Sequence, residues 1–82
     1  MAAEDDVLLR LAQASGLSAG ELRRFIELDA VGLRRDHVQP ALMRRLRRMR
    51  RLRRDLGLSV DAVVIIVRLL DRIEVLEHSR RP

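Results

Sequence analysis

This 82-residue sequence has no cysteine, tryptophan or tyrosine, and Phe25 is its only aromatic residue. Without cysteine the chain can form neither a disulfide nor a thiolate zinc site, and it suits a reducing compartment, so we expect a cytoplasmic protein. Any core must be built from aliphatic residues. A chain this short buries only about 60% of its unfolded surface. We therefore expect one domain that gains stability from a second chain or a partner.

Long apolar runs are also missing. The longest stretch without a charged residue is 11–20, whereas a membrane span needs about 20 apolar residues. The first residues, MAAEDD, are acidic, unlike the basic start of a secretory signal. Apolar residues make up 48% and charged residues 35% of the chain, which is typical of a globular domain. We expect no membrane segment.

The sequence offers little basis for catalysis or metal binding. His37 and His78 have no histidine or cysteine partner at metal-ligand spacing, and there is no glycine-rich phosphate loop. The acids Asp71, Glu74 and Glu77 recur at three-residue spacing, which we interpret as a solvated or partner-facing edge of a helix. We therefore predict a binding module without catalytic residues, metal or cofactor.

The net charge of +5 is unevenly distributed. Residues 1–41 contain five arginines and seven acids, whereas residues 42–82 contain twelve arginines and five acids. Eight arginines and no acid lie between Arg44 and Arg54. Phosphate neutralisation would suit such a run, but no aromatic residues are interleaved for base stacking. A solvated helix face is the interpretation we favour, with nucleic-acid contact as the alternative.

The first half of the chain predicts two short helices. A first helix from about Asp5 or Asp6, as N-cap, to Ser15 has apolar residues at helical spacing, and Gly16 is suited to end it in a left-handed turn. Ser18 and Glu21 form a capping-box pattern that starts a second helix. Together they predict a helix-turn-helix over about 6–31, with Leu22, Phe25 and Ile26 facing inward.

The second half predicts a polar connector over 32–39 and two more helices. Pro40 begins a basic helix over about 40–56, with an apolar stripe at Leu42, Leu46, Met49, Leu52 or Arg53, and Leu56. Gly57 ends it, and Ser59 caps an apolar helix over about 59–78.

The last helix has two apolar stripes. One is a heptad seam formed by Ala62, Ile66, Leu69, Ile73 and Leu76, and the other is formed by Val60, Val63, Val67 and Leu70. A helix that is apolar on two sides needs cover on both. We expect one stripe to pack on the helix-turn-helix and the seam to join a second copy in a homodimer.

These features resemble a known superfamily. The order of elements and the stretches LSAGELRRFIELDAV (17–31) and RRLRRMRRLRRDLGLSVDAV (44–63) resemble the MerR-like helix-turn-helix superfamily. The resemblance implies a small all-α domain of four helices with an apolar C-terminal helix. The connector is shorter than the family's DNA-binding wing and has no tyrosine, so the wing is truncated. Arg24 and Ile26 also depart from the DNA-binding pattern.

Within that superfamily the chain is most similar to the chaperone modulator CbpM family, which includes the DnaK–DnaJ assembly factor DafA. The similarity is carried by Glu21, Leu22, Leu28 and Val31 and by residues 52–77. It implies a protein that binds the J-domain of a DnaJ/CbpA-type co-chaperone and controls its access to Hsp70. Because J-domains present a basic helix to Hsp70, acids are the expected contacts: Asp71, Glu74 and Glu77, with Glu21 and Glu27 in reserve.

The alternative function is that of a minimal MerR-like DNA-binding regulator. Its expected DNA contacts are Arg23, Arg24, Arg34 and Arg35, with Arg44 and Arg45 on phosphates. Steep salt dependence would distinguish DNA binding from a partly apolar protein contact.

Overall fold

The described part of the chain is entirely helical outside its turns. The structure is a computed structural model that describes residues 2–31 and 40–80, with side chains from Asp6 onward. It contains four helices: α1 (Ala2–Ser15), α2 (Ala19–Glu27), α3 (Pro40–Asp55) and α4 (Val60–Ser79). The predicted all-α class is therefore confirmed. The connector 32–39, with Arg34 and Arg35, lies outside the described residues.

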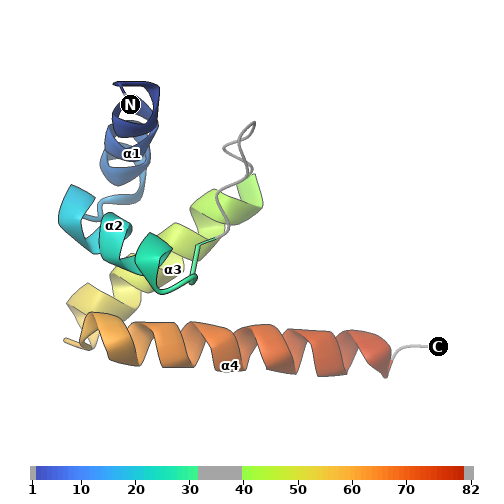
Figure 1. Ribbon diagram of the computed structural model, residues 1–82. Coiled ribbons are helices and arrows are strands. Elements are labelled where there is room, and N and C mark those ends of the chain that lie inside the picture. Colours follow the sequence, from blue (N-terminus) through green and yellow to red (C-terminus); the bar gives the residue numbers. More distant parts are fainter. Residues whose placement is uncertain (1, 32–39, 81–82) are drawn as a thin grey trace.

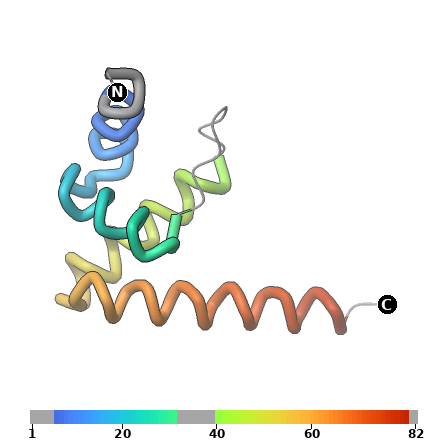
Figure 2. The backbone as a smooth tube through the Cα atoms, viewed as in Figure 1, coloured from blue at the N-terminus to red at the C-terminus, as the bar shows by residue number. Residues whose placement is uncertain are grey.

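The helices are arranged around one end of α4. In Figure 1, α1, α2 and α3 all lie on one side of α4, and the second half of α4 extends past them. The smooth trace in Figure 2 shows the same arrangement, with the blue end of the chain far from the red end. Helix α3 contacts α1 and α4, and α2 contacts the same two helices. The body of the domain is therefore built on the first half of α4.

Helix α1 begins earlier than its sequence predicts. It starts at Ala2, so the prediction of an N-cap at Asp5 or Asp6 is wrong. The predicted end is confirmed: Gly16 has φ +82°, and its amide donates to the Ala12 carbonyl at 2.9 Å. Leu17 then turns into the core.

Helix α2 has the predicted capping box at its start. The Glu21 amide donates to Ser18 Oγ at 3.0 Å, and the Ser18 amide donates to Glu21 Oε1 at 2.9 Å. Its end is a Schellman turn that the sequence analysis missed. Asp29 adopts φ +57°, its amide donates to the Ile26 carbonyl, and the Ala30 amide donates to the Phe25 carbonyl.

The ends of α3 and α4 mostly match their sequence signals. Pro40 is the first residue of α3, and Gly57 follows its end with φ +65°. Ser59 caps α4 by accepting from the Ala62 amide at 3.1 Å. The prediction that Leu56 belongs to the buried stripe is wrong, because Leu56 is 66% exposed. The helix ends at Asp55, so the helical period no longer directs that side chain, and Leu58 packs against the core instead.

The core lies where α1, α2 and α3 meet the first half of α4. Phe25 and Leu22 are fully buried, in agreement with their predicted inward direction, and Ile26 packs partly against them. The remaining core residues are almost all aliphatic: Leu11, Ala12, Leu17, Ala30, Val31, Leu46, Met49, Val63, Val64 and Val67. One side chain of larger volume therefore sits among small aliphatic ones.

Within residues 2–31 and 40–80, two glycines at positive φ give a matched test of backbone strain. A Cβ on Gly57 would meet nothing within 4 Å, whereas a Cβ on Gly16 would overlap Arg50 Nε and lie 2.6 Å from its Cδ. We expect Gly57→Ala to lower the free energy of unfolding by about 1 kcal/mol, from the left-handed conformation alone. Gly16→Ala should cost a similar amount, because the Arg50 atoms in the way belong to an exposed, flexible side chain that can move. Urea unfolding of both variants measures this, and a much larger loss for Gly16→Ala would contradict it.

Candidate protein-binding surface

Helix α4 presents two opposite apolar faces. Val63, Val64 and Val67 are buried against the body, and Val60 packs partly against the same core. The residues of the seam (Ala62, Ile66, Leu69, Ile73 and Leu76) share one face because they recur at intervals of three and four positions. That face lies on the opposite side of α4. Leu69, Ile73 and Leu76 are 56%, 49% and 57% exposed. The expected packing of one stripe on the body is confirmed. The seam is exposed from Leu69 onward, whereas Ala62 and Ile66 are half-buried.

Beyond Asp71 no described helix covers α4, and every residue from Arg72 to Arg80 is exposed. On the side opposite the seam, helical spacing brings together Asp71, Glu74, Val75 and His78, which we call the acidic face. Val75 is 67% exposed. Glu77 lies instead on a flank of the seam. The three predicted acids are therefore not equivalent, because Asp71 and Glu74 share a face that Glu77 does not.

Asp71 is held by a bidentate ion pair. Arg45 Nη1 and Nη2 donate to its two carboxylate oxygens at 2.7 and 2.9 Å, and Arg45 Nε donates to the Ala30 carbonyl at 2.8 Å. These hydrogen bonds from Arg45 lower the pKa of Asp71 against the opposing effect of burial, and the charges of Arg45 and Arg48 lower it further. Arg45 thus joins α3 to α4 and to the turn after α2. It leaves Asp71 less available to a partner than Glu74.

Glu21 is held even more firmly. Besides its capping role, it accepts from Arg53 Nε at 2.9 Å and lies 3.6 Å from Arg54 Nη2, with its side chain only 14% exposed. Burial by itself raises the pKa of Glu21, but hydrogen bonds from Ser18 and Arg53 outweigh burial, so that this pKa is lowered. Glu27, the other reserve acid, is exposed and lies 3.7 Å from Arg24.

A groove of about 480 Å³ runs between α3 and the outer part of α4. Leu42 and Val67 contribute apolar surface, and Arg44 and Arg48 line it together with Glu74. Neither of these arginines forms an ion pair with a described carboxylate. The groove therefore lies beside the acidic face, and exposed charges of both signs line it.

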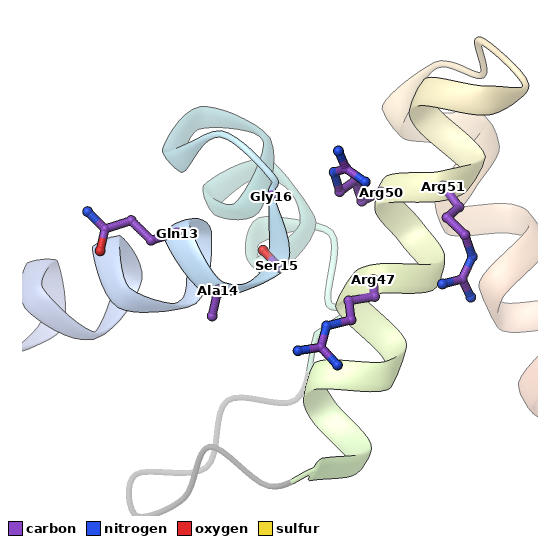
Figure 3. Close-up of a pocket in the computed structure, with 7 residues that line it drawn as sticks. All are labelled: Gln13, Ala14, Ser15, Gly16, Arg47, Arg50 and Arg51. Carbon is purple, nitrogen blue, oxygen red and sulfur yellow. The ribbon is translucent and has the colours of Figure 1, made fainter.

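The arginine-rich helix exposes a basic ridge on the side of α3 away from the core. Arg44, Arg47, Arg48 and Arg51 are exposed and recur at helical spacing. Figure 3 shows Arg47, Arg50 and Arg51 on α3 beside the end of α1, where they line a shallow hollow of about 360 Å³ with Gln13 and Gly16. A solvated helix face was the favoured interpretation of this run, and these exposures agree with it.

The arginines of the alternative DNA site have different surroundings. Arg23 on α2 and Arg44 on α3 are exposed. Arg24 lies 3.7 Å from Glu27 and 3.9 Å from Asp61, and Arg45 is committed to Asp71 and Ala30. Arg23 and Arg44 are therefore the members of that set, within the described residues, that form no ion pair.

Residues 2–31 and 40–80 form neither a metal-binding cluster nor a membrane-spanning helix. No three histidine, aspartate or glutamate side chains there gather closely enough to hold a metal ion. None of the helices described is both long and apolar enough to cross a membrane. The surface features of these residues are thus the ionic clusters, the groove, and the exposed faces of α3 and α4.

The chain matches a model of a known protein family. A family model described as "MerR HTH family regulatory protein" matches residues 20–81, which run from α2 to the C-terminal end of α4 and cover more than half of the chain. No curated protein and no solved structure matches this chain. The match therefore includes the second helix of the predicted helix-turn-helix, the basic helix and the apolar helix.

Proposed function

Because this chain belongs to the MerR helix-turn-helix family of regulatory proteins, we propose that it is a non-enzymatic regulator that acts by binding another protein. The partner is the J-domain of a DnaJ/CbpA-type co-chaperone, and binding controls access of that J-domain to Hsp70. The similarity of residues 52–77 to the chaperone modulator family motivates the choice of partner. The exposed second half of α4 supplies the surface.

The observation that carries this proposal is the acidic face. Glu74 is exposed, forms no ion pair with a described residue, and adjoins Val75, which is 67% exposed. An apolar contact beside a complementary charge is what a protein partner uses, since burial supplies affinity and charge supplies orientation and on-rate. A J-domain presents a basic helix to Hsp70, so an acidic, partly apolar face is suited to compete for it.

The test is a calorimetric titration of the full chain with an isolated J-domain from the same organism at physiological salt. We expect saturable binding of micromolar affinity or tighter. Glu74→Arg places like charge against the basic helix and should weaken binding at least tenfold. Asp55→Arg makes the same charge change at the exposed end of α3 and should leave affinity unchanged. Absence of binding by the folded wild-type chain would overturn the proposal.

A second candidate function is DNA binding by a minimal MerR-like regulator. It is favoured by the exposed Arg23 on α2 and by the basic ridge on α3. Gel shifts over a salt series separate the two functions. DNA affinity that depends on several phosphate contacts falls steeply as the salt concentration rises. The affinity of a partly apolar protein–protein contact falls only mildly. Loss of DNA binding in Arg23→Glu would assign the contact to α2.

A further inference from the structure

We infer that the groove between α3 and the outer part of α4 binds an acidic side chain of the J-domain partner, one that lies beside the partner's basic helix. Arg44 and Arg48 hold its carboxylate. The inference rests on the proposed function and deepens it, because the partner then presents charges of both signs, with base against Glu74 and acid against the two arginines. Glu74 belongs to both the acidic face and the groove, so a basic helix on that face brings neighbouring partner residues over the groove.

Arg44 and Arg48 present two guanidinium groups to the groove. They are four residues apart, so their side chains leave the same face of α3 one turn from each other. Both are exposed, and neither forms an ion pair with a carboxylate of residues 6–31 and 40–80. Hydrogen bonds from Arg45 are the main cause of the lowered pKa of Asp71, but the charge of Arg48 also contributes, which places the Arg48 guanidinium within electrostatic reach of the groove. Guanidinium groups at this spacing can bind a carboxylate with charge-assisted hydrogen bonds.

The third arginine of the groove is already neutralised. Arg45 donates from both Nη atoms to Asp71 and from Nε to the Ala30 carbonyl, so its charge is matched within the fold. Three arginines and two acids line the groove, which leaves it a net charge of +1. An anionic group is therefore the ligand that the remaining charge favours.

The shape of the groove favours a peptide segment over a small molecule. Sites for small molecules normally enclose most of their ligand, whereas this groove is open on one side. Leu42 is partly exposed beside the arginines and offers apolar surface to the methylene groups of an aspartate or glutamate. The volume of about 480 Å³ leaves room for side chains of a partner that lies across the groove.

The sign of a charge reversal separates this inference from simple attraction to a basic partner. If the partner offered only positive charge, Arg48→Glu would remove repulsion and tighten binding. If the groove holds a carboxylate, the same substitution places like charge beside it, and we expect Arg44→Glu and Arg48→Glu each to raise the Kd for the isolated J-domain roughly tenfold. Arg48→Gln removes the charge without reversing it and should give a smaller loss. Arg51→Glu makes the same reversal on α3 outside the groove and should not weaken binding.

Calorimetric titration of these variants with the J-domain at physiological salt measures the effect, and circular dichroism checks that each variant keeps its helices. The contact is then located on the partner by replacing the acids beside its basic helix with arginine, one at a time. One such J-domain variant should bind the wild-type chain weakly and recover affinity for Arg48→Glu.

Failure of this inference differs from failure of the proposed function. If the wild-type chain binds the J-domain and Glu74→Arg weakens that binding, but Arg44→Glu and Arg48→Glu both leave it unchanged or tighter, the inference is overturned and the proposed function stands. Absence of binding by the wild-type chain overturns both. Saturable binding of free glutamate that is lost in Arg48→Glu would assign the groove to a small carboxylate and overturn the choice of a peptide segment.

Discussion

Replacement of Phe25 by alanine is expected to remove most of the stability of the fold at 25 °C. Phe25 is fully buried and is the only aromatic side chain, among core residues that are otherwise small or aliphatic. Truncation of a buried phenylalanine typically lowers the free energy of unfolding by about 3–5 kcal/mol. That loss approaches the whole stability of a small domain, which lies near the lower end of about 5–15 kcal/mol.

Circular dichroism during thermal and urea unfolding measures this loss. Phe25→Leu retains most of the buried volume and should cost less than about 1.5 kcal/mol. Arg23→Ala, two positions away on the exposed side of α2, should stay within about 0.5 kcal/mol of wild type. An unfolding midpoint for Phe25→Ala close to that of Arg23→Ala would show that Phe25 is not the centre of the core.

Removal of the Glu21 side chain is the second substitution with a large expected effect. Glu21→Ala loses the hydrogen bond from the Ser18 amide, which is one half of the capping box, and leaves Arg53, which is also partly buried, without its carboxylate. We expect a loss of about 2 kcal/mol, to which the lost hydrogen bond from Ser18 contributes about 1 kcal/mol. Glu21→Gln can still accept from the Ser18 amide, so it should cost about half as much. Glu27→Ala, at the exposed last residue of the same helix, is the control.

The Glu21 carboxylate also makes the free energy of unfolding depend on pH. The pKa values of Glu21 and Asp71 are lowered in the folded chain from ordinary values of 4.5 and 3.8. Their stabilising contribution is therefore fully present above the ordinary values and is lost as the pH falls through the lowered ones. We expect a flat unfolding free energy from neutral pH to about pH 5 and a decline below it. Glu21→Gln should make that decline shallower, and an unchanged slope would contradict the assignment.

Local signals in the sequence were sufficient to predict most helix ends. Gly16, Ser18 and Ser59 act through their own backbone or through an amide a few residues away, so their roles follow from spacing alone. Asp29 was missed because a left-handed residue that is not glycine leaves no clear pattern. Leu56 was misassigned because a one-residue shift in a helix end redirects the side chain.

The ionic contacts could not be predicted in the same way. Arg45 and Asp71 are 26 residues apart, and Arg53 and Glu21 are 32 apart. Which of the eight arginines of α3 meets an acid depends on how the helices cross, and sequence spacing does not specify that crossing. The two apolar stripes of α4 were predictable because both follow the helical period. Because the heptad spacing assigned the seam to a second chain, the other stripe was left for the body, and Val63 and Val67 of that stripe are the ones that the structure buries.

As far as Asp71, α4 packs against neighbouring helices. Beyond Asp71, only the hydrogen bonds of its own backbone hold the helix. Residues 72–79 make about two turns, and isolated helices shorter than about 12–15 residues are marginal in water. Helix formation in this segment is therefore thermodynamically linked to whatever binds it. A ligand of either face would act as a template for folding, and its affinity would include the cost of ordering those turns. Substitutions that favour helix here would strengthen binding without touching the ligand.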